Sequence, residues 1–408
     1  MALFTRFILS SVLSFVALAL PAGAQEPGVG AGSISVVWRQ AVPFTTRPLL
    51  VDRGRLFVFS GGNASALDAS TGAVMWNYAG PTISEIAQQL GCACQNAAGP
   101  AGNGLYSVGG GDTLTALDPL TGAARWSRIV GEAIASPSVA ADGLVMLASG
   151  DQQGFSIYAL EDADGARRWE VRLRERPLPG LLAWRGLVFA PLSDGTLLAI
   201  EAPTGRPVWR EMVGDLPEPL APTQIGNDGT LVLRTQSAVL ALDAATGTRR
   251  WELAAPEFPP RPLVADDRVY LASGTGAISA VEASSGAVVW SRELGVLPGS
   301  EGLSRLAGSL YVTSFDGALI ALDPATGAQR WTREVGRTIA PPSLGAGGLH
   351  VGTLAGDVYV LEPNTGAVQF QLSLGGAILF SPVSVGDAVY VATDTEDGTT
   401  VLAVHGPD

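Results

Sequence analysis

The stretch Ala66-Leu67-Asp68-Ala69-Ser70-Thr71-Gly72-Ala73-Val74-Met75-Trp76 returns along the whole chain and decides the fold. In every copy a glycine lies four residues before an aromatic residue, and an acid lies four residues before that glycine. The other copies are residues 116–126, 159–169, 199–209, 241–251, 280–290, 321–331 and 360–370, the last with phenylalanine in place of tryptophan. The copies align without a gap, so the chain is built from one internal repeat.

Each copy predicts a β-hairpin. An apolar strand ends at the acid, the chain turns through Thr-Gly, and a second strand ends at the aromatic residue. The acid can accept hydrogen bonds from turn amides and from the threonine hydroxyl, and glycine supplies a positive φ. We favour this turn-capping role over a ring of metal ligands for the eight acids, Asp68, Asp118, Glu161, Glu201, Asp243, Glu282, Asp323 and Glu362.

The length of the repeat predicts an all-β, closed β-propeller of four-stranded antiparallel blades. Another pair of short strands precedes each hairpin, and successive aromatic residues, counted from Trp38, are 38 to 50 residues apart. Units of four strands and about 40 residues are typical of propeller blades. Residues 33–38 resemble the last strand of a unit, and residues 381–405 resemble a unit that lacks it. Joined, they complete one blade and close a ring, which a solenoid would not do.

The number of blades stays open between eight and nine. Eight complete units and one split unit give nine, whereas propellers usually have four to eight blades. The weakest unit is the second, because residues 80–104 replace a clear first strand with a glycine- and alanine-rich insertion.

Composition narrows the function classes. The net charge of −13 argues against a nucleic-acid partner. All 25 basic residues are arginine, which excludes a lysine Schiff base and a P-loop lysine. With only His350 and His405, a histidine-rich metal site is not expected.

The first 24 residues predict a secretory signal peptide. Arg6 precedes an apolar run that ends in Pro21-Ala22-Gly23-Ala24, a small-residue cleavage pattern. The remaining residues 25–408 then form a single propeller domain, exported to the periplasm or the extracellular space. No cysteine follows the apolar run and no later run reaches 18 apolar residues, so we expect a soluble protein with no lipid anchor and no transmembrane segment.

The Ala-Leu-Asp-x-x-Thr-Gly-x-x-x-Trp unit resembles the pyrroloquinoline quinone (PQQ) repeat, also called the tryptophan-docking motif, over essentially the whole mature chain. This resemblance implies one of two functions. In the first, the protein resembles the propeller of the outer-membrane barrel assembly machinery and is a non-enzymatic scaffold, which we expect to be a monomer that binds envelope or secreted proteins. In the second, it is a PQQ-dependent oxidoreductase of an alcohol or a sugar.

The residues favour the scaffold. The quinoprotein dehydrogenases that the repeat resembles use a calcium ion held by Glu, Asn and Asp, a catalytic Asp and, in the alcohol dehydrogenases, two adjacent cysteines. Here Cys92 and Cys94 are separated by one residue, no Cys-x-x-Cys-His is present, and no cluster of acids stands outside the turns. We therefore expect no cofactor and no catalytic residue, and PQQ with calcium belongs to the alternative only.

A few residues outside the repeat are candidate functional groups. Cys92 and Cys94 can form a disulfide that staples a loop, or pair between molecules. Arg47 and Arg261 each precede Pro-Leu at the start of a first strand, where they are either channel-mouth contacts for an anion or ordinary paired arginines. Trp184 is expected to pack within its blade, and His350 to be a structural histidine.

Overall fold

The computed structural model describes residues 35–42, 48–60, 63–80, 99–101, 104–109, 112–131, 133–134, 139–151, 154–216, 224–254, 261–345 and 347–405. The chain divides into a unit of residues 1–33 and a unit of residues 34–408, and the strands all belong to the second. Across the described ranges, no helix has the length and apolar character needed to cross a membrane.

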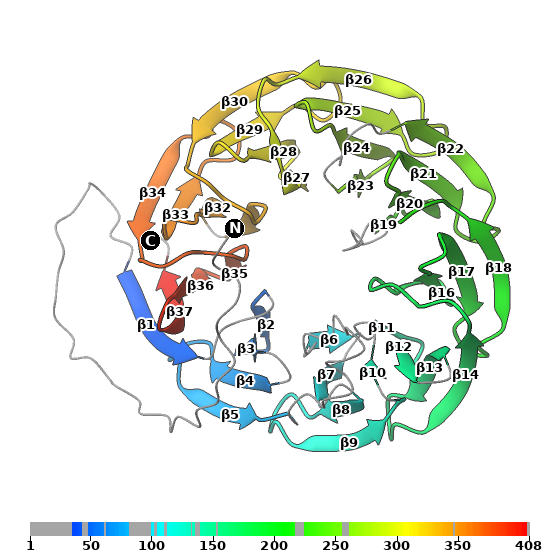
Figure 1. The fold of residues 1–408 in the computed structure, drawn as a ribbon. Coiled ribbons are helices and arrows are strands. Elements are labelled where there is room, and N and C mark those ends of the chain that lie inside the picture. Colours follow the sequence, from blue (N-terminus) through cyan, green and yellow to red (C-terminus); the bar gives the residue numbers. More distant parts are fainter. Residues whose placement is uncertain are drawn as a thin grey trace. The chain divides into compact units, whose positions relative to one another are not determined.

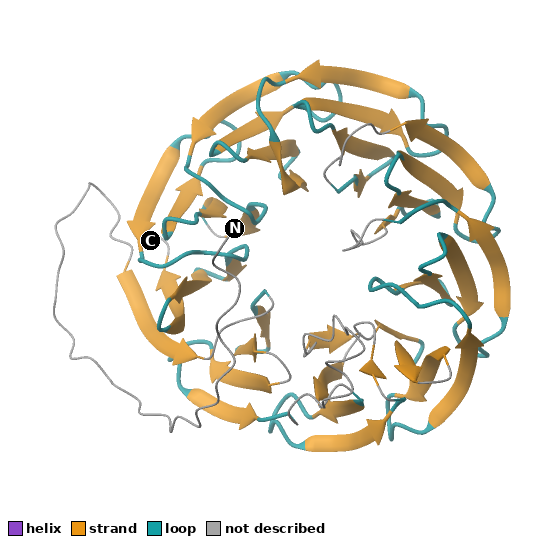
Figure 2. Ribbon diagram, in the orientation of Figure 1, coloured by secondary structure: helices purple, strands orange, loops and turns teal. Residues whose placement is uncertain are grey.

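Nine antiparallel sheets stand around a common centre (Figure 1), and the described elements are strands and turns (Figure 2). The first strand of each sheet is the innermost: β2 (Leu50–Asp52), β6 (Gly99–Ala101), β10 (Ala133–Ile134) with β11 (Val139–Ala141), β15 (Leu182–Trp184), β19 (Gln224–Ile225), β23 (Leu263–Ala265), β27 (Pro298–Leu306), β31 (Ser343–Gly345) and β35 (Val383–Val385). The second strands are β3 (Arg55–Ser60), β7 (Gly104–Gly109), β12 (Leu144–Asp151), β16 (Leu187–Pro191), β20 (Thr230–Arg234), β24 (Arg268–Ala272), β28 (Ser309–Ser314), β32 (Gly348–Gly352) and β36 (Ala388–Thr395).

The outer half of each sheet is the hairpin of the repeat. The third strands are β4 (Asn63–Asp68), β8 (Thr113–Leu117), β13 (Gly154–Glu161), β17 (Thr196–Glu201), β21 (Ala238–Asp243), β25 (Ala277–Glu282), β29 (Ala318–Leu322), β33 (Asp357–Leu361) and β37 (Gly398–His405). The outermost strands are β5 (Val74–Tyr78), β9 (Ala124–Ile129), β14 (Arg167–Leu173), β18 (Pro207–Met212), β22 (Arg249–Ala254), β26 (Val288–Glu293), β30 (Gln329–Glu334), β34 (Val368–Ser373) and β1 (Ser35–Val42).

The molecule is a nine-bladed β-propeller, which resolves the open count. We number the blades in chain order, so that blade 1 is β2–β5 and blade 9 is β35–β37 completed by β1. The second repeat unit, the weakest in sequence, forms a complete sheet, β6–β9. In blade 3 the innermost strand is in two pieces, β10 and β11, which both pair with β12.

The predicted closure by the N-terminal strand is confirmed. Strand β1 pairs antiparallel with β37 from Ser35 opposite His405 to Val42 opposite Thr399. The closure also has a side-chain component, because the Trp38 ring packs on Tyr390 with centroids 6.1 Å apart. Pairing the first and last described strands removes two free sheet edges from the ring.

The acid of the repeat caps its hairpin turn as expected. In blade 1 the Asp68 carboxylate accepts hydrogen bonds from the amides of Ser70 and Thr71 and from both of their hydroxyls. The Gly72 amide donates to the Asp68 carbonyl at 2.8 Å, and its φ of +73° is one that a residue with a side chain resists.

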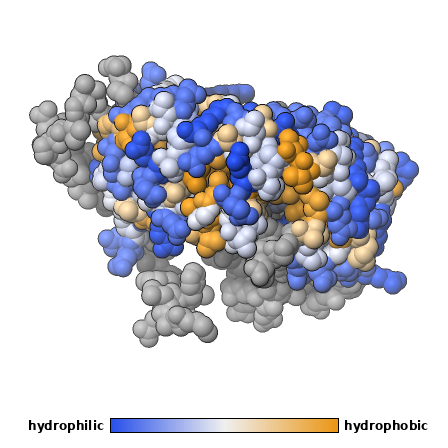
Figure 3. Space-filling view, turned by 90° about the horizontal axis from the view of Figure 1, so that it is seen from above, coloured by the Kyte–Doolittle hydropathy of each residue, from blue (hydrophilic) through white to orange (hydrophobic). Residues whose placement is uncertain are grey.

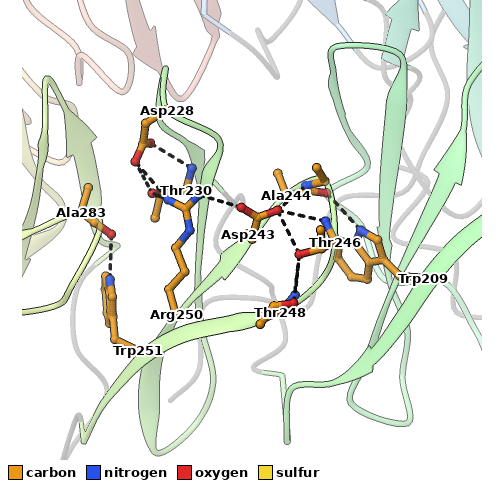
Figure 4. A network of polar contacts seen from close by, with 11 residues as sticks. Trp209, Asp228, Thr230, Asp243, Ala244, Thr246, Thr248, Arg250, Trp251 and Ala283 are labelled. Atoms are coloured by element: carbon orange, nitrogen blue, oxygen red, sulfur yellow. Dashed lines mark hydrogen bonds and ion pairs between the residues drawn. The ribbon is translucent and has the colours of Figure 1, made fainter.

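Blade 5 extends this turn into a larger polar network. The Asp243 carboxylate accepts hydrogen bonds from the Thr246 amide and from the Arg250 guanidinium, which also reaches Asp228 and Thr230 (Figure 4). The network ties the outermost strand to the second strand across the third. Ion pairs therefore stabilise blade 5 in addition to the backbone hydrogen bonds between its strands.

Each tryptophan of the repeat joins one blade to the next. The Trp76 indole N–H donates to the Pro119 carbonyl of blade 2 at 3.1 Å, and its ring lies over Gly122, where an added Cβ would be 2.5 Å from ring atoms. Two constraints therefore require glycine at position 122: its φ of +71° and the close approach of the Trp76 ring. The other tryptophans that donate to the next blade in this way are Trp38, Trp126, Trp169, Trp209, Trp251, Trp290 and Trp331.

The eighth copy of the repeat has phenylalanine in place of tryptophan. Phe370 lies on β34 of blade 8, the blade that precedes the closing blade 9. Its ring has no N–H, so it cannot donate the hydrogen bond that the tryptophans make to the next blade.

The core is divided among the contacts between blades. Along a strand, alternate side chains face the two neighbouring blades. In β3, Leu56 and Val58 pack with Tyr390 of blade 9, whereas Phe57 packs with Trp76 and with Leu105 of blade 2. The face of the molecule drawn in Figure 3 is mostly hydrophilic with separate hydrophobic groups. Outermost strands carry the exposed hydrophobic residues Val74, Met75, Val208, Val288, Val289 and Val368.

Candidate protein-binding surface

Two cavities flank blade 1, where its turns meet those of its neighbours. The turn between β2 and β3 and the turn between β4 and β5 lie at the same end of the blade, because the Ala69 amide donates to the Gly54 carbonyl at 3.0 Å. A cavity of about 760 Å³ opens between blades 9 and 1, and we call it the closure cavity. A second cavity of about 630 Å³ opens between blades 1 and 2, and we call it the blade 1–2 cavity.

Exposed apolar side chains surround both openings. Val37 and Met75 are each 45% exposed and Val385 is 50% exposed, and all three line the closure cavity. Leu120, 54% exposed, lines the blade 1–2 cavity. Apolar groups that line a concave surface and are open to solvent are typical of protein interaction sites. We call these four residues together with the two cavities the blade 1 surface.

The acids of the two turns at this surface are engaged by their own turns. Hydrogen bonds from the Ser70 hydroxyl and the Thr71 amide lower the pKa of Asp68 below its ordinary value. The amides of Thr121 and Leu120 do the same to the pKa of Asp118. Both carboxylates are therefore ionised at neutral pH and already accept hydrogen bonds.

Two arginines lie between the cavities and line both of them. Arg53 is in the turn between β2 and β3 with a φ of +47°, a region that favours glycine, asparagine and aspartate, and its guanidinium lies 3.8 Å from Asp52. Arg55 is the first residue of β3. Its side chain makes no hydrogen bond or ion pair with any residue that the structure describes, and its Nε is buried without a partner.

The residues singled out in the sequence do not gather here. Arg47, Cys92 and Cys94 lie outside the described residues, as do the predicted signal peptide residues 1–24. Arg261 lies two residues before the innermost strand β23, half-buried and already in contact with another group. Its proposed role as a channel-mouth anion contact stays a prediction.

His350 and Trp184 are packing residues in the described structure. His350 is fully buried, and its Nδ1 lies 2.6 Å from the Ser384 hydroxyl of blade 9, as expected of a structural histidine. Trp184 was expected to pack within its blade, but it reaches across to blade 5, where a Cβ on Gly229 would lie 2.9 Å from its ring. The Arg185 guanidinium lies over the Trp184 ring, 4.7 Å from the indole centroid.

Sequence reasoning missed Arg55. Its only signal is the run Asp52-Arg53-Gly54-Arg55, in which two arginines flank the glycine of a tight turn. An arginine in the same register of blade 6, Arg268, is paired, so the identity of the residue alone does not reveal which of the two is unpaired.

The acids of the repeat do not assemble into a metal site. Where the chain is described, no three His, Cys, Asp or Glu side chains come together as metal ligands. The repeat carboxylates instead cap separate turns around the ring, as Asp68, Asp118, Asp243 and Asp323 show. This donor set does not fit a calcium ion beside a quinone, and we derive no quinone chemistry from it.

A family model described as "Outer membrane protein assembly factor BamB" matches the chain at residues 89–218, 193–340 and 316–406. Together these segments cover more than half of the sequence. The chain belongs to this family of PQQ-repeat propellers. The resemblance inferred from the repeat is thereby confirmed for the fold and the family.

The name of an individual relative agrees with that of the family model. The "Outer membrane protein assembly factor BamB" of Nitrosomonas eutropha is 27% identical over 250 residues, which is 59% of this chain and 50% of that protein. The chain thus spans half the length of that relative.

Solved structures show the fold but do not separate scaffolds from enzymes. BamB from Moraxella catarrhalis superposes with a TM-score of 0.55 at 20% identity, covering 75% of this chain and 93% of that one. A europium-containing methanol dehydrogenase gives 0.56 at 13% identity, covering 91% and 93%. The two scores are nearly equal, so function has to be argued from the surface.

Proposed function

We propose that this chain is an exported, non-enzymatic β-propeller scaffold that binds protein partners in the cell envelope through the blade 1 surface. One observation carries the proposal: two adjacent cavities, rimmed by exposed Val37, Met75, Leu120 and Val385, share an arginine that has no partner among the described residues. Membership in the BamB family supports it, because the relatives are named as outer membrane protein assembly factors.

The composition of the surface suits a reversible protein contact. Interfaces are enriched in methionine and arginine, and their energetic centres are pockets that exclude water. Here apolar side chains surround two concave sites, and the buried Arg55 Nε lies near their shared wall. A partner that filled the cavities would remove this apolar surface from water.

Site-specific photocrosslinking tests the proposal. A photoreactive amino acid in place of Met75, in intact cells that make the protein, should give a discrete crosslink to an envelope protein. The matched control is Val289, which holds the same place before its tryptophan in blade 6 and is 40% exposed. A crosslink at position 75 that is absent at position 289 and is abolished by Val385→Asp would support the scaffold.

Two further results distinguish the scaffold from the alternative function, a PQQ-dependent oxidoreductase. If position 75 gives no crosslink to an envelope protein, or position 289 gives the same one, the blade 1 surface is not the binding site. Reconstitution with PQQ and calcium, followed by a dye-reduction assay with alcohols and sugars, is run in parallel. Stoichiometric quinone binding with turnover would overturn the non-enzymatic reading.

A further inference from the structure

Arg55, which pairs with none of the described residues, lies on the wall of the blade 1–2 cavity. Arg55 lies opposite Asp68 in the β3–β4 ladder and has the same parity as Phe57, two residues on. Because Phe57 packs with Leu105 of blade 2, strand alternation places the Arg55 side chain on the face of blade 1 that looks toward blade 2. This is the wall of the blade 1–2 cavity.

The equivalent arginine of blade 6 shows what this position does when it is only structural. Arg268 lies opposite the repeat acid Glu282, as Arg55 lies opposite Asp68. Its guanidinium donates to the Pro324 carbonyl of the next blade at 2.7 Å. In blade 1 the corresponding carbonyl, Pro119, accepts only from Trp76 among the described residues, and Arg55 makes no such bond.

The cavity in front of Arg55 is both open and amphipathic. Next to it, β7 begins with Gly104, whereas the equivalent strand of blade 7 begins with Ser309. Its volume of about 630 Å³ falls within the range of ligand pockets, about 300–1,000 Å³. The described apolar lining is Leu50, Val51, Phe57, Leu105, Pro119 and Leu120.

Among the described charged residues that line the cavity, Arg55 is the one that lacks a counterion. Asp118 is engaged by its turn amides, and Asp52 faces Arg53 at 3.8 Å. The Arg55 side chain is half-buried and makes no hydrogen bond or ion pair with any described residue, so an anion bound at its terminal nitrogens would supply interactions that it lacks. A planar guanidinium matches a carboxylate with two parallel hydrogen bonds.

We propose that the blade 1–2 cavity binds the side-chain carboxylate of an acidic residue of a partner protein, with a neighbouring apolar side chain of the partner on the apolar wall. The carboxylate pairs with Arg55, and the apolar side chain lies against Leu105 and Leu120. This inference rests on the proposed scaffold function and names the chemistry that one of its cavities recognises.

Nuclear magnetic resonance of the full chain, with ¹⁵N-labelled arginine, tests the pairing directly. The probe is the blocked dipeptide acetyl-Leu-Glu-amide, whose only charge is a side-chain carboxylate, and acetyl-Leu-Gln-amide is its uncharged match. We expect the Nε–H signal of Arg55, assigned with Arg55→Lys, to shift saturably with the glutamate peptide. The glutamine peptide should bind at least about tenfold more weakly, the order expected for one charge-assisted hydrogen bond.

Variants and a second peptide make the test selective. Arg55→Gln should weaken binding of the glutamate peptide by at least about tenfold, whereas Arg268→Gln, its match in blade 6, should leave binding unchanged. A shift at Arg55 that is not saturable, or is equalled at Arg268, would overturn the inference. So would preference for acetyl-Leu-Leu with a free terminal carboxylate, which would assign the site to a chain end.

The outcome is distinguishable from that of the proposed function. Saturable peptide binding at Arg55 without any envelope crosslink at position 75 would refute the scaffold but keep the carboxylate site. A crosslink that is retained in a chain whose Arg55 does not respond to the glutamate peptide would keep the scaffold and refute this inference.

Discussion

The junction between blades 1 and 2 and the junction between blades 6 and 7 share one docking contact but differ in one arginine. At both, a tryptophan indole donates to a proline carbonyl of the next blade and lies over a turn glycine. At the second, Arg268 donates to the same carbonyl; at the first, Arg55 does not, and a cavity opens beside it. Equivalent positions in a repeat therefore need not make the same structural contact.

The largest expected effect comes from the glycine beneath the tryptophan. Gly122→Ala and Gly327→Ala should each destabilise the fold by about 2–4 kcal/mol, because the new Cβ would be strained at a positive φ and would lie 2.5 Å from Trp76 or Trp290. Urea unfolding monitored by tryptophan fluorescence measures the change in the free energy of unfolding.

Gly308→Ala is the matched control for backbone strain. Gly308 has a φ of +75° but no atom within 4 Å of an added Cβ, so its loss should cost only about 1 kcal/mol. If all three variants lost the same stability, the close approach of the tryptophan ring would contribute nothing, and the two junctions could not be said to share a docking contact.

Replacing the tryptophans should sharpen the difference between the junctions. Trp76→Phe should cost about 1 kcal/mol more than Trp290→Phe, because Pro119 then loses its described donor whereas Pro324 keeps Arg268. Thermal unfolding of the two variants and the parent compares them. Equal losses would mean that Arg55 moves to the vacated Pro119 carbonyl, which contradicts its assignment as a binding residue.

The architecture of this chain was predictable because the repeat encodes it locally. Asp68, Gly72 and Trp76 each act within a turn or on the adjoining blade, so their spacing predicted the hairpin, the turn cap and the blade. The closing strand, β1, was also predictable, since residues 33–38 match the end of a unit. The nine-blade count was left open, because the weak second unit gave no clear first strand.

The candidate site was not predictable in the same way. Arg55 and Arg268 are the same residue type in the same register, and only the three-dimensional contacts show that the guanidinium of one of them is paired. Trp184 likewise was assigned to its own blade, whereas it packs against Gly229 of the next. A contact between repeats depends on the residues of both, and the spacing within one unit does not contain it.

A direct comparison of the two arginines has a smaller expected effect on stability. Arg268→Gln should cost about 1 kcal/mol, because its hydrogen bond to the Pro324 carbonyl is lost. Arg55→Gln should leave the free energy of unfolding within about 0.5 kcal/mol, since no described partner is lost. If Arg55→Gln destabilised the chain as much as Arg268→Gln, Arg55 would be a structural residue and the two junctions would be alike.

The smallest expected effect lies in the acids that precede the two prolines. Hydrogen bonding from Arg330 is the main cause that lowers the pKa of Asp323 from 3.8 to about 2, whereas turn amides lower the pKa of Asp118. Because the pKa of Asp323 is lower in the folded chain, its stabilising contribution is complete above pH 3.8 and is lost as the pH falls through about 2. Carbon-13 carboxyl titration should show that Arg330→Gln raises the pKa of Asp323 toward 3.8 and leaves that of Asp118 unchanged. A parent Asp323 that already titrates near 3.8 would show that its ion pair with Arg330, 2.7 Å long, does not stabilise the turn at this junction.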